Sequence, residues 1–552
     1  MNPAAQILER NAAQALAHFI AKEQHRAERL TAALPRPMAQ ASRAAWAQLV
    51  GVRDAGNTSP VSVANAGLRD TLLELKAANV TRAYDLRKIR DHARNYATVA
   101  GHISTHAKRL EFIDAYAPGA TFPKHATPAS IAARTADARW WRRQLRKVWT
   151  RASENAGRRL GLVNRDAALY ASDEAVLWRA AQLRTMAEYA EHTDLVSDAG
   201  ETLQLDAVRA GSVSNPKIRR GEFMARARGC TELAELHQHA AVFVTLTCPS
   251  RFHAHGQGGR NANHTRESVL EGQRYLCTLW ARARAKFKRD QVFYYGFRIA
   301  EPHHDGTPHW HLLLFVPKHQ EATLRSVLES QALRDSPHEP GAQERRIVFK
   351  SLDAAAGGAV AYVAKYVSKN IDGAGTIAAA DGEAPAQNVA RGVARVDAWA
   401  AVHGIRQFQQ LGGPAVTLWR ELRRAREAVA DADIERARVQ ADAGSYAGFV
   451  QCVGGIRVGR RTSIRLEKVE TGERNVYGEH RPPRLVGLRC ASALVITRPH
   501  TWRLVRRCRQ AAPQIRALSG SFHDLGPVAI TVRSGFPPSS DLTPANRSTA
   551  PP

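Results

Sequence analysis

The chain has few cysteines for its length, and none of them form a Cys-x-x-Cys pair. Its 552 residues include six cysteines, which are dispersed as Cys230, Cys248, Cys277, Cys452, Cys490 and Cys508. A zinc ribbon needs closely spaced cysteines, so this spacing speaks against one. Dispersed thiols suit a reducing cytosol.

The sequence also lacks a long apolar run. Its first residues, MNPAAQILERNAAQALAHF, carry Glu and polar side chains where a signal peptide needs an apolar block. No later stretch is long and apolar enough to span a bilayer. We therefore expect a cytoplasmic protein with no membrane partner.

A Gly-Lys pair is absent as well, which excludes a phosphate-binding P-loop. The composition is otherwise strongly basic, with 79 Lys and Arg against 51 Asp and Glu and a net charge of +28. Such a surplus indicates a polyanionic partner, most simply nucleic acid. The alternative is a GC-rich genome that favours Arg and Ala codons.

The first 235 residues are rich in Ala, Leu, Arg and Glu and predict a mostly α-helical region. Within it, the segment RWWRRQLRKVW places Trp140, Trp141, Leu145 and Trp149 at roughly helical spacing among basic residues. This stripe is typical of a buried helix face. The alternative is a helix that contacts DNA by stacking or through phosphates, which would give the region a DNA-binding role.

After residue 235 the pattern changes to strands alternating with helices. Strands are predicted over residues 240–250, 291–301, 309–317 and 345–352, and helices over 265–289, 320–333 and 353–370. An Asp-Gly turn in PHHDGTP joins the second and third strands as a hairpin. The fold class predicted is α+β, with an antiparallel sheet flanked by helices after a mostly α-helical N-terminal region.

The pattern divides the chain into five parts. These are a helical N-terminal region (1–235), the α+β domain (236–375), a helical extension (376–440), a small β-rich region (441–533) and a disordered tail rich in Pro, Ser and Thr (534–552). A chain of this length is expected to fold as more than one domain.

Two histidines stand at the start of the third predicted strand, HWHLLLFVP. Residues two apart on a strand face the same way, so His309 and His311 share one face and can bind one divalent ion. The pairs at 237/239 and 253/255 lie in no comparably strong strand pattern. The alternative is a histidine pair satisfied by hydrogen bonds at a strand edge.

A carboxylate faces this pair across the hairpin. Glu301 ends the preceding strand, and the turn folds it back opposite His309. Two histidines and one carboxylate suit Mg²⁺ or Mn²⁺, and would also accept Zn²⁺, Co²⁺ or Ni²⁺. His303, His304 and Asp305 lie close enough to compete with Glu301 as ligands.

The segment GGAVAYVAKYVSKNID contains two tyrosines four residues apart. On a helix, Tyr362 and Tyr366 lie on one face, and Lys365 and Lys369 fall on the same stripe. One interpretation is an amphipathic helix with half-buried tyrosines. The other is that a phenolate, favoured by the nearby ammonium groups and by a metal, attacks a DNA phosphodiester. A metal would then stabilise the charge on the phosphate.

These residues resemble the gene A replication endonucleases of tailed phages and related prophages, within the HUH (His-hydrophobic-His) rolling-circle initiators. The likeness is carried by FVTLTCPSRFHA, YGFRIAEPHHDGTPHWHLLLF, GAVAYVAKYVSKNIDG and GIRQFQQLGGPAVTLWRELRR, in the family's order over residues 240–426. The metal hairpin and the tyrosine helix are highly specific when they occur together.

The resemblance implies an HUH endonuclease domain, with the histidines on the central strand of the sheet and the tyrosine helix alongside. It implies that His309, His311 and Glu301 bind the metal and that Tyr362 and Tyr366 are the nucleophiles. The implied activity is a metal-dependent nick in one strand at the origin, leaving a 5′-phosphotyrosine and a 3′-hydroxyl primer, with later rejoining of the displaced strand.

The implied partners are single-stranded and origin DNA, in the cytoplasm of a bacterial host. Since the chain has no P-loop, a host helicase would have to unwind the duplex. Two alternatives remain: a two-tyrosine HUH transposase, and a non-catalytic DNA-binding protein on the same fold. In the second, the positive charge would matter and the tyrosines would not.

Overall fold

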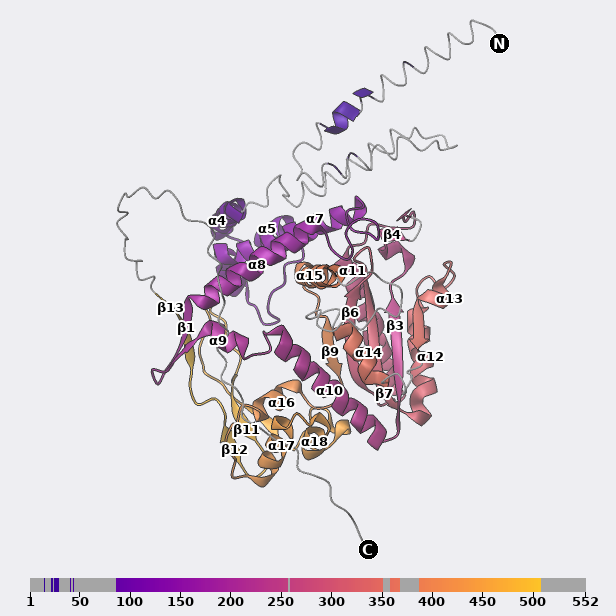
Figure 1. Ribbon diagram of the computed structural model, residues 1–552. Coiled ribbons are helices and arrows are strands. Elements are labelled where there is room, and N and C mark those ends of the chain that lie inside the picture. Colours follow the sequence, from indigo (N-terminus) through magenta and orange to yellow (C-terminus); the bar gives the residue numbers. More distant parts are fainter. Residues whose placement is uncertain are drawn as a thin grey trace, which may run out of the picture. The chain divides into compact units, whose positions relative to one another are not determined.

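The computed structural model describes residues 86–256, 259–350, 358–367 and 387–507, together with a few isolated positions between 14 and 43 (Figure 1). The described residues up to Arg506 belong to one compact unit, and so do all the elements below. The predicted tail, Cys508, Lys369 and the ends of the helix expected over 353–370 lie outside the described residues.

A five-stranded antiparallel sheet lies at the centre of this unit, with the strand order β8-β3-β7-β6-β9. Its strands are β3 (His239–Thr247), β6 (Tyr295–Pro302), β7 (Pro308–Pro317), β8 (Ile347–Lys350) and β9 (Phe408–Leu411). Strands β6 and β7 are buried almost throughout, because helices cover both faces of the sheet. The α+β prediction and the predicted hairpin are confirmed, and β7 is the middle strand.

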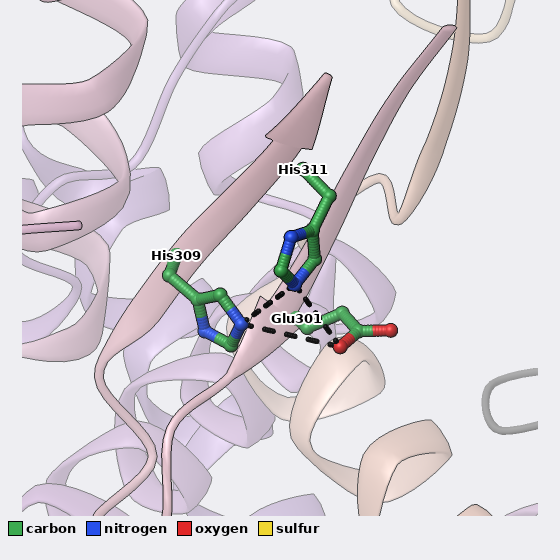
Figure 2. Close-up of side chains that lie close together, drawn as sticks. All are labelled: Glu301, His309 and His311. Carbon is green, nitrogen blue, oxygen red and sulfur yellow. Dashed lines mark hydrogen bonds and ion pairs between the residues drawn. The ribbon is translucent and has the colours of Figure 1, made fainter. Parts of the chain in front are cut away.

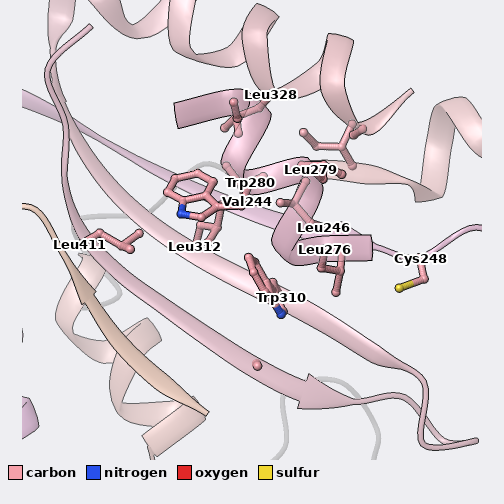
Figure 3. Packing of buried hydrophobic residues seen from close by; sticks show 14 of the residues in the cluster. Val244, Leu246, Cys248, Leu276, Leu279, Trp280, Trp310, Leu312, Leu328 and Leu411 are labelled. Carbon is pink, nitrogen blue, oxygen red and sulfur yellow. The ribbon is translucent and has the colours of Figure 1, made fainter. Parts of the chain in front are cut away.

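One face of the sheet packs against helices α11 (Val269–Arg289), α12 (Glu321–Ala332) and α15 (Gln387–His403). The apolar stripe of α11, including Leu276, Leu279 and Trp280, lies against Trp310 and Leu312 of β7 (Figure 3). A capping box between Ser268 and Glu271 starts this helix. The amphipathic helix predicted here is confirmed.

The opposite face carries the phenylalanines of β3, β6 and β7 and is covered by a second set of helices. These are α10 (Pro216–Leu236), α14 (Gly358–Val367), α16 (Val416–Leu422), α17 (Ala432–Asp442) and α18 (Tyr446–Cys452). Helices α10 and α18 approach closely at Gly229, where a Cβ would lie 2.6 Å from the Cβ of Tyr446. A larger side chain at this position would force the two helices apart.

Four N-terminal helices have a core of their own: α4 (Leu86–His102), α5 (His106–Tyr116), α6 (Pro128–Thr135) and α7 (Ala138–Arg159). They are followed by α8 (Asp173–Glu191) and α9 (Leu205–Ala210), and Ala175 of α8 belongs to the same core as α11. Trp140, Trp141, Leu145 and Trp149 of α7 are buried in the core of the four N-terminal helices, against Ile89 of α4 among others. The core interpretation of the tryptophan stripe is therefore confirmed, and DNA stacking by these side chains is wrong.

Several elements lie where the sequence did not predict them. Strands β1 (Thr193–Ser197) and β2 (Thr202–Gln204) interrupt the region expected to be helical, and β1 pairs with β13 (Trp502–Arg506). Strand β9 lies within residues 376–440, which were expected to be a helical extension, whereas helix α15 in the same segment fits that expectation.

The remaining described elements include α13 (Ala342–Arg345) and a second antiparallel sheet. Its strands are β10 (Arg465–Val469), β11 (Arg484–Arg489) and β12 (Leu494–Ile496), which lie within the segment predicted to be β-rich. The domain boundaries stay predictions. Of the helices that the structure describes, none combines the length and the apolar character needed to cross a membrane.

Candidate metal and nucleophile site

The register of the central strands brings the predicted metal ligands together. In the β6–β7 pairing Glu301 lies opposite His309, and in the β3–β7 pairing Thr245 lies opposite His311. Directly opposed residues on antiparallel strands share a face. The three predicted ligands therefore project from the same side of the sheet, at the end nearest the hairpin turn.

The three side chains converge on one point (Figure 2). The Glu301 Oε2 atom lies 3.6 Å from Nε2 of His311 and 4.0 Å from Nε2 of His309, and the two Nε2 atoms are 2.9 Å apart. Glu301 and His311 are buried, and the side chain of His309 is 12% exposed. Within the described ranges, this is the one group of three metal-ligating side chains whose ligand atoms all lie within 4.8 Å of one another.

The chemistry of these donors fits a divalent cation. Two imidazole nitrogens and one carboxylate oxygen form an open set that leaves positions for water or phosphate. The Glu301 carboxylate is buried, and a bound cation would balance its charge. The site is a candidate metal centre, and its donors do not distinguish Mg²⁺ from Mn²⁺.

The orientation of His311 is fixed by a residue that the sequence did not single out. The Thr245 hydroxyl lies 3.0 Å from Nδ1 of His311, at hydrogen-bond distance. A contact at Nδ1 leaves Nε2 as the ligand atom and holds the ring plane in place. Nothing in the local sequence marks Thr245, because its role depends on the pairing of β3 with β7.

The competing ligands in the turn have other partners. Asp305 accepts a hydrogen bond from the Ala254 backbone N–H at 2.8 Å and pairs with Arg158 at 3.5 Å. Burial acts to raise the pKa of Asp305, but contacts with His253 and Arg158 keep that pKa well below its usual range. Asp305 is thus a structural anion, and Glu301 is the carboxylate that reaches the histidines.

His303 lies beside the site rather than in the ligand group. Its ring centroid is 4.2 Å from that of His309 and 5.0 Å from that of His253. Burial, followed by the charge of His253, lowers the pKa of His303 to about 3, so its imidazole is neutral. It packs against the ring of His309, a candidate ligand.

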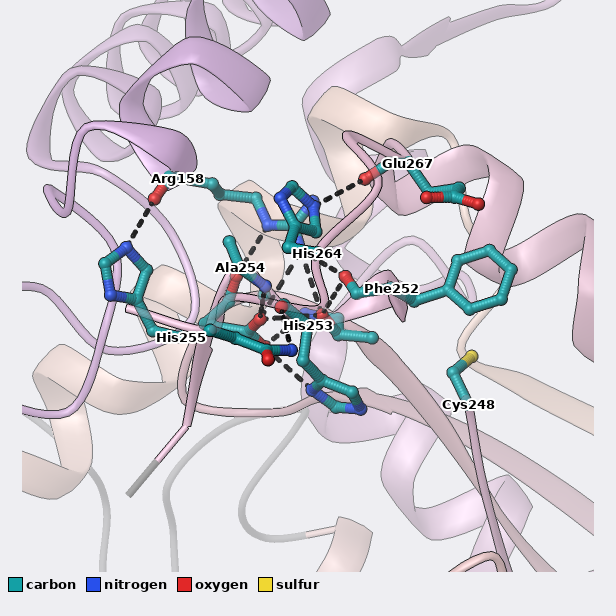
Figure 4. A network of polar contacts seen from close by, with 12 residues as sticks. Arg158, Cys248, Phe252, His253, Ala254, His255, His264 and Glu267 are labelled. Carbon is teal, nitrogen blue, oxygen red and sulfur yellow. Dashed lines mark hydrogen bonds and ion pairs between the residues drawn. The ribbon is translucent and has the colours of Figure 1, made fainter. Parts of the chain in front are cut away.

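The hairpin turn is held by side chains from distant parts of the chain. Arg158, at the end of α7 and 2% exposed, donates to the backbone oxygens of Asp305 (2.6 Å) and Phe252 (3.1 Å) and to Oγ1 of Thr307 (2.9 Å). Figure 4 shows Arg158 in this network. Trp399 of α15 donates its indole N–H to the Gly306 oxygen at 2.8 Å. These contacts hold the turn that sets Glu301 against His309.

The tyrosine helix packs on the same face as the metal group. The ring centroid of Tyr366 lies 4.3 Å from that of His311 and 5.8 Å from that of Phe243. Tyr366 is 9% exposed and belongs to the core of this face. Tyr362 and Lys365 lie on α14 as predicted, but their side chains are outside the described part of the structure.

The fold and the site define an α+β protein with a candidate metal centre beside a buried tyrosine. Residues 72–374, more than half of the chain, match the bacteriophage replication gene A protein (GPA) family. The chain belongs to this family. A comparison with solved structures gives no significant match.

Curated relatives come from phages and prophages. The chain is 36% identical over 389 residues to the replication protein of Haemophilus phage HP1, covering 69% of this chain and 49% of that one. It is 34% identical over 407 residues to the replication gene A protein of Escherichia phage P2, covering 70% of this chain and 53% of that one. The same identity and length hold for a probable replication endonuclease from a prophage-like region of Salmonella typhi, covering 70% and 50%. The chain thus spans about half the length of these relatives.

Proposed function

We propose that this protein initiates rolling-circle DNA replication by nicking one strand at the origin. The observation that carries the proposal is the position of Tyr366, whose ring packs against His311 of the Glu301–His309–His311 group. A phenol beside a candidate metal centre is the pair of groups that a tyrosine endonuclease needs. Membership of the replication gene A family and the net charge of +28 support it.

In the proposed reaction the phenol oxygen of a tyrosine attacks the phosphorus of one phosphodiester. A bond forms between this oxygen and phosphorus, the bond from phosphorus to the 3′-oxygen breaks, and a 5′-phosphotyrosine and a 3′-hydroxyl result. The phenol gives up one proton and the 3′-oxygen gains one, with water as the carrier. The energy of the broken bond is kept in the phosphotyrosine, so the strand can later be rejoined without ATP.

The residues of the site have distinct roles in this proposal. Glu301, His309 and His311 would hold a divalent cation, Mg²⁺ or Mn²⁺. When bound, such an ion draws charge from the scissile phosphate. Lys365 and Lys369 would contact phosphate oxygens, since ammonium groups stabilise charge on a phosphate.

Tyr362 is proposed as the second nucleophile. Four residues of helix separate it from Tyr366, a rise of about 6 Å along the axis. One tyrosine could hold the parental 5′ end while the other cuts the next one. This alternation would end one round of replication as another begins.

The wider arrangement proposed is that of an HUH endonuclease within residues 236–375. It is supported by the position of the histidines on β7, the middle strand, and of α14 on the same face. The proposed partners are single-stranded and origin DNA and a host helicase, in the cytoplasm of a bacterial cell.

The test is incubation with a single-stranded oligonucleotide from its own replicon, in the presence of Mg²⁺ or Mn²⁺. We expect a covalent adduct that mass spectrometry maps to Tyr366 or Tyr362. Joining of the cleaved end to a second, unrelated DNA would indicate a transposase instead. Tight DNA binding with no adduct under any metal would reject the endonuclease and favour a non-catalytic DNA-binding protein.

A further inference from the structure

Helix α7 carries a row of basic side chains along the stretch that precedes Arg158. Between Asp137 and Glu154 it contains no acidic residue, and its basic residues there are Arg139, Arg142, Arg143, Arg146, Lys147 and Arg151. The tryptophans take the buried side of the helix. Consequently Arg139, Arg143 and Lys147 are exposed, and Arg142 and Arg146 are half-buried beside them.

Like charges gather at the middle of this helix. Helices α4 and α7 pack together (Figure 1) and bring Arg90 near Arg142 and Arg146. Burial lowers the pKa of Arg146, and the charges of Arg142 and Arg90 lower it further. In the part of the chain that the structure describes, no carboxylate forms an ion pair with Arg142 or Arg146. Arg142 and Arg146 therefore keep positive charge that can attract a polyanion.

Exposed arginines elsewhere in the chain behave differently. Arg436 pairs with Asp433, Arg481 lies 3.1 Å from Glu473, and Arg489 lies 2.8 Å from Glu467. Because their charge is already compensated locally, these side chains have little attraction left for a phosphate. The contrast singles out α7 rather than the basic composition in general.

The same helix is tied to the candidate metal site. Its last turn carries Arg158, which holds the turn between β6 and β7. Helix α7 runs without a break from Ala138 to Arg159. At 1.5 Å per residue, Arg142 and Arg158 are therefore about 24 Å apart along its axis. A polyanion bound at the middle of α7 would lie at a fixed distance from the hairpin turn.

We propose that Arg142, Arg146 and Lys147, the α7 basic surface, bind the phosphodiester backbone of DNA at a fixed distance from the site of the nick. The position of the nick rests on the function proposed above, whereas backbone binding does not. A separation of about 24 Å corresponds to roughly seven base pairs of duplex at 3.4 Å per pair. Helix α7 would then set the register of the bound strand relative to the metal centre.

The first test measures DNA affinity across salt concentrations with the full chain. The variant Arg142→Gln/Arg146→Gln/Lys147→Gln is compared with Arg436→Gln/Arg481→Gln/Arg489→Gln, which removes the same three charges from locally paired positions. Both bind a duplex and a single strand of equal length and sequence. Each lost phosphate contact lowers the slope of log affinity against log salt by about 0.9 for duplex and about 0.7 for single strands.

We expect the α7 variant to lose about 2 to 3 units of this slope, on the DNA form that the surface prefers, and the control to lose much less. Equal slopes in the variant and the unsubstituted protein would overturn the proposal, and so would equal losses in the variant and the control. The variant Arg142→Lys/Arg146→Lys keeps both charges and should retain nearly the full slope. This would exclude a folding defect as the cause.

The second test locates the contact by hydroxyl-radical footprinting on origin DNA. The unsubstituted protein should protect a second position on the DNA, away from the cut, and this protection should disappear in the α7 variant while protection at the cut remains. Loss of protection only at the cut would overturn the proposal. If the unsubstituted protein forms no covalent adduct, the proposed nuclease function fails, yet the salt slopes still decide whether the surface binds DNA.

Discussion

At the scale of single residues, the hydroxyl of Thr245 contacts the ring of a candidate metal ligand, His311. It contacts Nδ1 of His311 at 3.0 Å, so removing it frees the ring to rotate. We expect Thr245→Val, which keeps the shape, to weaken Mn²⁺ binding by about 10- to 100-fold. Electron paramagnetic resonance titration measures this. The control is Thr135→Val, which removes another buried hydroxyl far from the site in sequence; an equal loss there would contradict the assignment.

The two histidines are predicted to hold the metal without supporting the fold. His309→Ala/His311→Ala should abolish Mn²⁺ binding and adduct formation. The proposed DNA affinity should stay nearly unchanged, because Lys and Arg contacts to phosphate usually supply most of such affinity. The chain offers a matched control in His237→Ala/His239→Ala, another His-x-His pair whose rings stack at 5.5 Å. Adduct formation by the first double variant in the presence of a chelator would disprove the metal assignment.

The proposed roles of the two tyrosines can be tested by removing their hydroxyl groups. Tyr366→Phe keeps the ring that packs against His311 and removes only the proposed nucleophile. We expect replication of the replicon to fail in Tyr366→Phe and in Tyr362→Phe. At least one of these single variants should still form an adduct on a suicide oligonucleotide. The double variant should form none. An adduct in the double variant, mapped by mass spectrometry, would show that another group attacks.

The candidate ligands could be predicted from the sequence because a strand and a tight turn encode their relation locally. His309 and His311 share a face by alternation, and the hairpin places Glu301 opposite His309. Thr245 and Arg158 could not be predicted. Their partners lie 66 and up to 149 residues away, and a single sequence contains no local signal for such contacts.

At the scale of elements, the hairpin turn contains a buried ion pair between Arg158 and Asp305. Arg158 and Asp305 each expose 2% of their side chains. Arg158→Met leaves the carboxylate buried without its cation, and we expect a loss of about 3 to 5 kcal/mol in the free energy of unfolding. Arg158→Met/Asp305→Asn should lose less, because no unpaired charge remains. Urea denaturation measures both, and equal losses would show that the charge is unimportant.

Low pH should destabilise the same turn by protonating Asp305. The folded-state pKa of Asp305 is depressed, whereas its unfolded value is about 4. The stabilisation from its carboxylate is therefore fully present above about pH 4 and is lost as the pH falls through the folded-state value. In Asp305→Asn this part of the acid dependence should disappear from the unfolding curves.

Elements with strong local patterns could be predicted, and those defined by distant pairing could not. Strands β3, β6, β7 and β8 and helices α11 and α12 follow from their apolar periodicity. Strand β9 is short and forms by pairing with β6 at the edge of the sheet. Strand β1 pairs with β13, which lies some 300 residues later. In such elements, pairing with a distant strand, rather than the local sequence, determines which residues become a strand.

At the scale of the whole molecule, the predicted boundary at residue 235 crosses a shared core. Helix α10 contributes Phe223 and Leu233 to the same cluster as Phe243 and Phe297 of the sheet. Arg158, from still further upstream, holds the turn of the metal hairpin. The N-terminal helices therefore complete the sheet domain in addition to any contact with DNA.

This arrangement makes a prediction about truncation. A fragment that begins at residue 236 loses α10, which exposes the aromatic face of the sheet to water, and loses the cation of the Asp305 pair. Each buried phenylalanine that becomes exposed costs about 1.5 to 3 kcal/mol, which is a large fraction of the stability of a typical domain. We expect this fragment to aggregate, with no cooperative urea transition and no adduct. A fragment that begins at residue 86 keeps all elements from α4 onward and should unfold cooperatively. If the shorter fragment melts cooperatively and still forms the adduct, the N-terminal helices do not complete the catalytic fold, and the expected boundary at residue 235 marks an independent domain.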